Sequence, residues 1–150
     1  MSDEREQRTP GDWPYHGEEP LTVVELDDHD DGRGGAFYLP HDALEWLGPM
    51  AEVHLVTARS GAIRGNHLHE RRRELILVHG IGPWELAWRP AGGDTAKRTF
   101  REPGAVLLAV EPGTPHAIRN LGDEELVIVS CSSGRWDPDH PDTRPVALLD

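Results

Sequence analysis

The sequence contains little cysteine and no long apolar run, and each shortage excludes a class of protein. Its 150 residues include one cysteine, Cys131, so no disulfide can form within the chain and we expect a reducing, cytoplasmic setting. The longest uninterrupted apolar stretch, residues 105–110, is far shorter than the ~20 residues of a membrane-spanning helix. The first residues include no apolar segment of the secretory type, so we expect no secretory signal.

Positive charge is also scarce. There are 15 basic and 27 acidic side chains, a net charge of −12, which argues against nucleic-acid partners and against docking on an anionic membrane. The excess is uneven, because residues 1–31 hold 11 acidic and 2 basic side chains, a net −9 that leaves −3 for the rest of the chain. The acidity therefore does not exclude an anionic small molecule as substrate.

The chain divides by composition near residue 20. Residues 1–20 combine proline, glycine and charge with almost nothing to bury, which predicts a flexible acidic arm. The alternative is that Trp13 and Tyr15 anchor this arm on a partner subunit. Residues 21–150 have the length of a single domain with one core.

Short β-rich segments separated by glycine and proline fill most of this domain. One segment, residues 41–47, predicts a brief helical turn that ends at Gly48. Residues 137–143 predict a proline-punctuated tail that crosses the surface. Evenly spaced short strands are typical of a β-sandwich or barrel, so we expect an all-β fold. The strands are expected at 21–26, 36–39, 51–58, 62–69, 73–79, 83–89, 95–100, 105–110, 115–119 and 124–132.

Three histidines and one glutamate form a candidate metal site. His67 and His69 are two apart in an expected strand, so their side chains share a face, and Glu74 follows a tight turn. His116 lies on a distant strand and can join them only if the sheet folds round on itself. Imidazole and carboxylate ligands suit Zn(II), Fe(II), Mn(II) or Ni(II). The alternative is a similar fold that holds no catalytic metal.

The spacing of these residues resembles the two cupin motifs. Gly61, His67-x-His69 and Glu74 match the first motif, and Gly113, His116 and Asn120 match the second. The resemblance covers residues 21–145 and implies a cupin double-stranded β-helix, which is a jelly-roll barrel. It also implies a homodimer and one divalent metal ion, with zinc as our first expectation and iron, manganese or nickel compatible.

A narrower resemblance concerns residues 64–69, 112–116 and 136–143. Together they are similar to the C-terminal cupin of capsular-polysaccharide reductase-epimerases, and more distantly to dTDP-4-dehydrorhamnose 3,5-epimerases and dTDP-sugar ketoisomerases. Residues 136–143 are the most diagnostic, since other cupins lack them. The resemblance implies an epimerase or isomerase of a nucleotide-linked 4-keto-6-deoxy sugar. The chain departs from the pattern at Leu68, where relatives often have tyrosine, and we expect no reductase domain.

Such a reaction needs an acid–base group beside the metal. Glu52 and His54 share a strand face that the cupin frame directs inward. We expect His54 to carry the proton, with Glu52 as a pocket residue or a less favoured base. The alternative for His54 is a core histidine bonded to a backbone carbonyl.

Arg64, Asn66 and Arg119 are the candidate substrate-binding residues. The two arginines flank the motifs and suit an anionic pyrophosphate, whereas ion pairs with the surplus carboxylates are the alternative for both. Arg71, Arg72 and Arg73 predict a solvated loop, and contact with a phosphate is the alternative. Two other functions stay open, namely an Fe(II)-dependent cupin oxygenase of secondary metabolism and a non-catalytic module that binds a metabolite.

Overall fold

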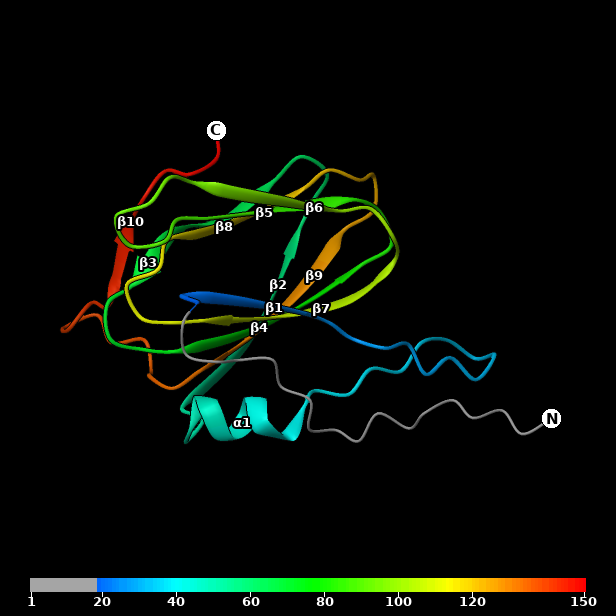
Figure 1. Ribbon diagram of the computed structural model, residues 1–150, viewed down its shortest axis with the longest axis horizontal. Coiled ribbons are helices and arrows are strands. Elements are labelled where there is room, and N and C mark those ends of the chain that lie inside the picture. Colours follow the sequence, from blue (N-terminus) through cyan, green and yellow to red (C-terminus); the bar gives the residue numbers. More distant parts are fainter. Residues whose placement is uncertain (1–18) are drawn as a thin grey trace.

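The computed structural model describes residues 19–150, which form two five-stranded antiparallel sheets packed face to face (Figure 1). The first sheet has the order β1 (Leu21–Glu25), β7 (Gly104–Val110), β4 (Glu74–Gly80), β9 (Leu126–Ser132), β2 (Glu52–Ala58). The second has the order β10 (Thr143–Pro145), β3 (Ile63–His69), β8 (His116–Asn120), β5 (Trp84–Trp88), β6 (Ala96–Phe100). This confirms the predicted all-β jelly roll. The arm predicted for residues 1–20 lies almost entirely outside the described residues.

The main core lies between the two sheets. The side chains of a strand alternate between its two faces, and in β9 the buried Leu126 and Ile128 alternate with more exposed neighbours. Both belong to this core. Trp84 of β5 stacks on Phe100 of β6, with ring centroids 4.2 Å apart and an interplanar angle of 14°. These apolar side chains fill one end of the barrel, so polar groups gather at the other end.

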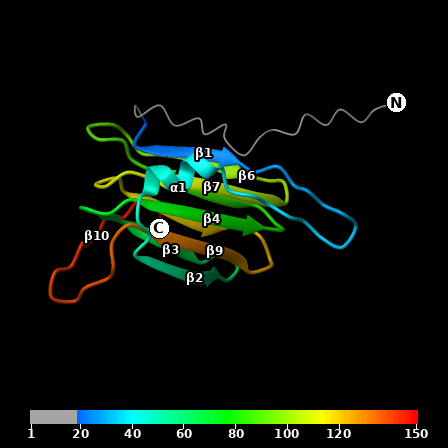
Figure 2. The ribbon, with the colours of Figure 1, turned by 90° about the horizontal axis from the view of Figure 1, so that it is seen from below.

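Strand β7 is apolar on both faces because a helix covers its outer side. Helix α1 (His41–Leu47) packs Ala43 and Leu47 against Leu107 and Ala109 of β7, over the outer face of the first sheet (Figure 2). The helix ends at Gly48, whose φ of 76° turns the chain away. Among the described residues, no helix is long and apolar enough to cross a membrane.

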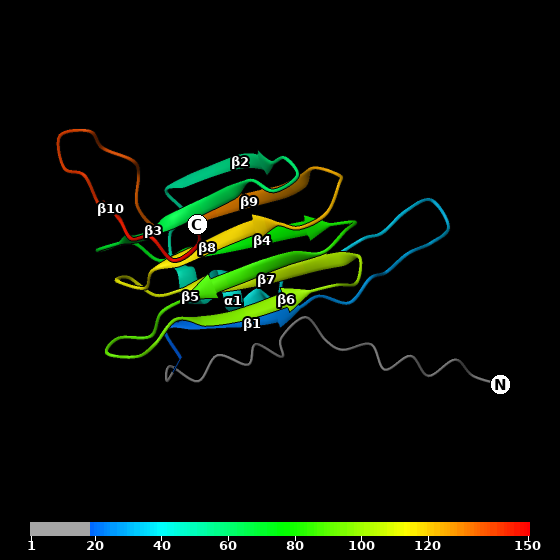
Figure 3. The ribbon, with the colours of Figure 1, turned by 90° about the horizontal axis from the view of Figure 1, so that it is seen from above.

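The C-terminal segment lies over the outer face of the second sheet (Figure 3). Leu148 and Leu149 pack against Ala87 and Ala117, which belong to β5 and β8. The backbone N–H of Val146 donates to the carbonyl of Asn66 at 2.8 Å. Both sheets are therefore covered on their outer sides over part of their area.

The predicted strands agree with the observed ones, and most of their ends are shifted by one or two residues. Two elements of the structure differ from the prediction. Residues 36–39 form no strand, because this segment is an irregular link that ends at Pro40, the N-cap of α1. Conversely, β10 forms where only a surface tail was predicted. Its three residues pair with the edge of β3, a position that tolerates Pro145 because an edge strand need not donate on its outer side.

Candidate active site

A β-bulge in β3 turns its functional side chains toward the barrel interior. Arg64 pairs with Ile118 and His67 with His116, so one extra residue lies between two inward-facing positions. Asn66 absorbs it with a φ of 55°, a conformation that asparagine tolerates better than most residues. In a regular strand, residues three apart would face opposite sides. The bulge therefore places Arg64 and His67 on the same face.

The first sheet contributes the carboxylate from the opposite wall. Glu74 opens β4, and its Oε2 accepts a 2.6 Å hydrogen bond from the hydroxyl of Ser130 on β9. Both side chains are buried. Ser130 is buried on the inward face of β9, so its hydroxyl needs a partner there and fixes the carboxylate.

The four predicted metal ligands meet in one cluster. The candidate ligand atoms of His67, His69, Glu74 and His116 all lie within 4.8 Å of one another. The Oε1 atom of Glu74 is 2.8 Å from Nε2 of His69 and 3.5 Å from Nε2 of His116. Three of these side chains are at most about 5% exposed, and His67 is half-buried. The structure thus brings together residues up to 49 positions apart in sequence.

Burial and mutual charge set the protonation of the cluster. Burial, together with the neighbouring imidazoles of His116 and His69, lowers the pKa of His67 to about 4. Burial also lowers the pKa of His116. For Glu74, burial favours the neutral acid, but the contacts with His69 and His116 and the Ser130 hydroxyl outweigh it and lower the pKa to about 2. At neutral pH the ionised carboxylate of Glu74 therefore lies beside the neutral imidazoles of His67 and His116.

The hydrogen bonds around this cluster fit a divalent metal ion. Nδ1 of His116 donates to the carbonyl of Thr114 at 3.0 Å, so the lone pair of this neutral ring is on Nε2 and faces Glu74. Nδ1 of His69 is likewise engaged, 3.1 Å from the hydroxyl of Thr143. Oε1 of Glu74 is buried without a hydrogen-bond partner. An imidazole lone pair and a carboxylate oxygen that face each other repel, and a cation bound by both relieves that repulsion.

A cavity of about 160 Å³ opens over this cluster. His54 of β2 and Arg64 of β3 both line it. His54 is half exposed, and its Nδ1 lies 3.9 Å from Oε1 of Glu52. Nε of Arg64 donates to the carbonyl of Thr57 at 2.8 Å, which anchors the guanidinium at the cavity wall. The lining thus joins the four-residue cluster to a half-exposed imidazole and an anchored positive charge.

Glu52 lies beside the cavity and does not line it. Its Oε2 accepts a 2.9 Å hydrogen bond from the backbone N–H of Trp136. This contact ties the start of β2 to the loop after β9. The geometry therefore favours a supporting position for Glu52, with His54 nearer the chemistry.

Asn66 and Arg119 lie on the outer face of the second sheet, away from the cavity. The amide of Asn66 binds the C-terminal segment, accepting from the backbone N–H of Leu148 at 3.0 Å and of Leu149 at 3.1 Å. Arg119 pairs with Glu85 at 3.1 Å and also donates to the carbonyl of Asp150. The structure does not bring either residue to the cavity, and we assign neither a substrate contact.

Two functional residues escaped the sequence analysis. Arg72 lines the cavity, although its run of three arginines predicted a solvated loop. Thr143 of β10 also lines it and holds His69. The available signal for Thr143 was its position at the end of the diagnostic 136–143 segment. For Arg72, its position two residues before Glu74 could have indicated that it lies near the cluster.

Comparisons with known proteins place this fold in one class. Two solved structures share the architecture, and each likeness shows the fold. NovW from Streptomyces spheroides, a 4-keto-6-deoxy sugar epimerase, is 19% identical with a TM-score of 0.70, over 89% of this chain and 72% of that one. CapF from Staphylococcus aureus, a capsular polysaccharide assembling protein, is 24% identical with a TM-score of 0.59, over 83% of this chain. The chain spans about a third (33%) of CapF. The architecture is thus a cupin-type jelly roll.

The family follows from the sequence match. Residues 43–144 match the model of the polysaccharide biosynthesis C-terminal domain, and the chain belongs to that family. It is also similar to the spore coat polysaccharide biosynthesis protein SpsL of Bacillus subtilis, with 25% identity over 131 residues that cover 84% of this chain and 87% of SpsL. The predicted resemblance to cupins of polysaccharide biosynthesis is confirmed.

Proposed function

We propose that this protein is a metal-dependent epimerase or isomerase of a nucleotide-linked 4-keto-6-deoxy sugar. The observation that carries the proposal is the cavity in which His54 and Arg64 face the cluster of His67, His69, Glu74 and His116. Membership in the polysaccharide biosynthesis family and the cupin-type fold support the substrate class. The expected product is the same sugar with one stereocentre inverted or its keto group moved.

The reaction requires removal of the proton next to a ketone and its return to the same or another carbon. His54 is the proposed carrier of this proton, because its ring lines the cavity and half of it is open to an entering substrate. Oε1 of Glu52 lies 3.9 Å from Nδ1 of His54, so its negative charge stabilises the protonated form of the His54 ring. The apolar lining residues Val56, Ile118 and Ile128 limit the water around the reacting carbon.

The four-residue cluster would hold the proposed metal ion. A divalent ion bound there supplies a Lewis acid for the keto oxygen. Zinc is our first expectation, and iron, manganese and nickel suit the same ligands. Ser130, Thr114 and Thr143 fix the ligand atoms, so the chain itself orients the cluster without rearrangement.

Arg64 is the proposed anchor for the negative charge of the substrate. Its Nε is engaged by the carbonyl of Thr57, which leaves the two terminal nitrogens of the fork to meet an oxyanion. It lies on the inner face because of the bulge at Asn66. Arg64 therefore sets the orientation of the sugar in front of His54.

The test measures solvent deuterium incorporation at C3 or C5 of dTDP- and UDP-4-keto-6-deoxyglucose, with elemental analysis of the purified protein. We expect exchange at one of these carbons and about one divalent ion per chain. Absence of exchange with both substrates overturns the proposal. Oxygen consumption by an iron-loaded protein without exchange would favour the oxygenase instead.

A further inference from the structure

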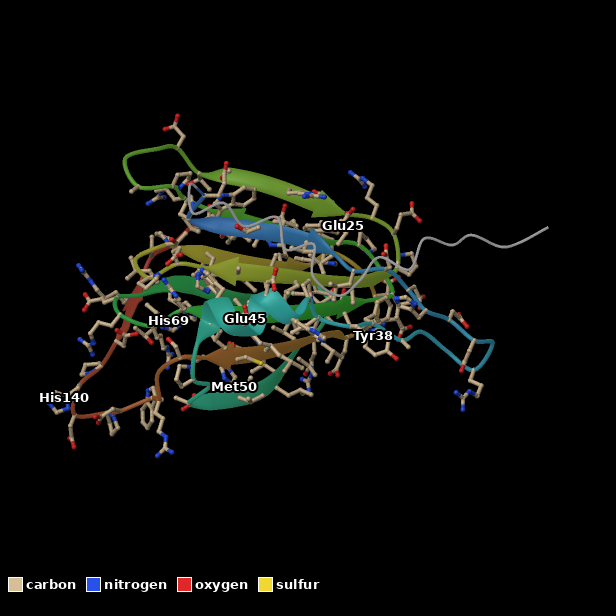
Figure 4. All side chains as sticks on the ribbon, turned by 60° about the horizontal axis from the view of Figure 1, so that its bottom comes forward. Glu25, Tyr38, Glu45, Met50, His69 and His140 are labelled. Atoms are coloured by element: carbon tan, nitrogen blue, oxygen red, sulfur yellow. The ribbon has the colours of Figure 1, made fainter. Side chains whose placement is uncertain are left out.

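A second cavity adjoins the candidate active site and has no part in the reaction proposed above. Its volume is about 310 Å³, and we call it the arginine cavity. It lies against the loop between β9 and β10, which projects at one end of the sandwich (Figures 1 and 2). His140 on this loop and His69 of the cluster are found toward the same end of the molecule (Figure 4). Its lining comprises Arg71, Arg72, Ser133, Gly134, Arg135, Asp137, His140 and Asp142.

Arg72 belongs to the linings of both cavities. Its side chain is only 10% exposed, and its Nε is buried without a hydrogen-bond partner, because the nearest oxygen, Oδ2 of Asp142, is 3.7 Å away. Its Nη1 makes one long contact of 3.4 Å with the carbonyl of Gly134. A buried guanidinium with unused donors is costly, and an anion in the cavity would satisfy it.

The carboxylates of the arginine cavity are already engaged. Asp142 accepts a 2.8 Å hydrogen bond from the backbone N–H of Arg71 and lies 3.5 Å from the Nε of the same residue. Oδ2 of Asp137 is 3.2 Å from Nδ1 of His140. Arg135 is exposed at the rim, and within residues 19–150 no hydrogen bond or ion pair engages it. Three guanidinium groups thus face a cavity that also holds two carboxylates. Asp137 is paired with His140, whereas Oδ2 of Asp142 is buried without a hydrogen-bond partner, 3.7 Å from Nε of Arg72.

We propose that the arginine cavity binds the phosphate groups of a nucleoside diphosphate through Arg71, Arg72 and Arg135. The guanidinium fork matches the oxygens of a phosphate in a bidentate manner, which explains arginine in all three positions. Since Arg72 lines both cavities, a diphosphate held there carries its sugar toward His54 and the cluster. The inference rests on the proposed function, because a nucleotide sugar is the ligand that spans both cavities.

This placement also gives the 136–143 segment a physical role. Asp142 pairs with the side chains of both Arg71 and Arg72, and Thr143 binds His69. One short segment therefore fixes the arginines on one side and the cluster on the other. A family that handles nucleotide sugars has use for such a segment, whereas a cupin that binds an uncharged molecule has none.

Calorimetric titration of the full-length protein with UDP, dTDP, uridine and inorganic phosphate tests the proposal. We expect the diphosphates to bind and uridine to bind at least about tenfold more weakly. Arg135→Gln and Arg72→Lys should each raise the Kd for the preferred diphosphate by about tenfold or more. Arg101→Gln, on an exposed turn outside both cavities, is the matched control and should leave Kd unchanged.

Each alternative has its own result. Unchanged diphosphate affinity in Arg135→Gln overturns the proposal, and this exposed substitution does not endanger folding as Arg72→Lys does. Inorganic phosphate that binds as tightly as UDP would indicate a free-anion site and overturn the nucleotide assignment. If His54→Gln loses UDP binding while the arginine variants keep wild-type affinity, the phosphates bind in the main cavity and the proposal is overturned. If no sugar exchange is found but the arginine variants weaken UDP, the proposed function fails while the arginine cavity stands.

Discussion

The hydroxyl of Ser130 lies 2.6 Å from Oε2 of Glu74, and it donates a hydrogen bond to that oxygen in the buried wall of the cavity. The two residues come from neighbouring strands, β9 and β4, whose register places Ser132 opposite Glu74 and Ser130 one inward position further along. The bond leaves Oε1 directed at the imidazoles of His69 and His116. A serine thus determines which carboxylate oxygen the cluster can use.

Ser130→Ala should weaken metal binding without disrupting the fold. The substitution leaves a buried carboxylate oxygen without its donor, so we expect metal affinity to fall by about 10–100-fold and the free energy of unfolding to fall by about 1–3 kcal/mol. Competition with a chelating dye measures the affinity. Ser60→Ala, in the exposed turn between β2 and β3, is the control. Wild-type affinity in Ser130→Ala would show that the carboxylate needs no orientation.

Thr143→Val should have a similar but separable effect through His69. Valine keeps the shape of threonine and removes the hydroxyl that lies 3.1 Å from Nδ1. We expect a loss of about tenfold or more in metal affinity, with recovery in Thr143→Ser because serine restores the hydroxyl. If the valine and serine variants behave alike, β10 acts through its backbone pairing alone.

His54→Gln should abolish proton exchange and leave the metal content intact. The side chain lines the cavity but does not belong to the four-residue cluster. We expect the rate of solvent deuterium incorporation to fall by about 10²–10⁴-fold. Glu52→Gln should cost less, since Oε2 accepts a hydrogen bond from the Trp136 backbone beside the cavity. A larger loss in Glu52→Gln than in His54→Gln would reverse the assignment of the base.

Gly65→Ala should destabilise the protein more than Gly92→Ala. Both glycines have positive φ, 88° and 69°, so both substitutions carry the same kind of backbone strain, about 1 kcal/mol. A Cβ at Gly65 would also lie 2.7 Å from the carbonyl oxygen of His116, whereas a Cβ at Gly92 meets nothing within 4 Å. Urea unfolding measures both losses. Equal losses would mean that β3 and β8 can separate at the bulge at no cost.

The expected homodimer can be tested on the edge strand β2. Val53 and Leu55 are 55% and 63% exposed on the outer face of this strand, which pairs on one side only, with β9. We expect light scattering to show a dimer that the double substitution Val53→Lys, Leu55→Lys converts to a monomer. The inner residues of β2 are untouched, so folding should persist. A dimer that survives both lysines uses another surface.

The sequence predicted the metal-site cluster better than its surroundings. His67, His69 and Glu74 could be grouped because they lie on consecutive strands, and His116 could be added because its surroundings resemble the second cupin motif. The inward position of Arg64 depends on the bulge at Asn66, and a period of two residues cannot show a bulge. The structure brings Arg64 to the cavity, whereas a regular strand would have placed it on the opposite face from His67.

Other differences arose where tertiary contacts decide. Arg119 lies three residues after His116 on β8, so the two side chains face opposite sides of the sheet. On the outer side Arg119 pairs with Glu85, which belongs to the neighbouring strand β5. Strand β10 exists only because the edge of β3 offers backbone groups to a short proline-containing segment. Neither pairing is visible locally, since each joins residues more than 30 positions apart.

The cluster and the residues that fix it come from five strands and the loop between β7 and β8, and this has a consequence for folding. The Thr114 carbonyl, the Ser130 hydroxyl and the Thr143 hydroxyl come from separate parts of the chain, and each must be in place before the ligand atoms are held. Partly assembled sheets would offer only scattered histidines with weak affinity. Uptake of an ion would therefore report closure of the whole barrel, and a metal-sensitive dye could follow the last step of refolding in real time.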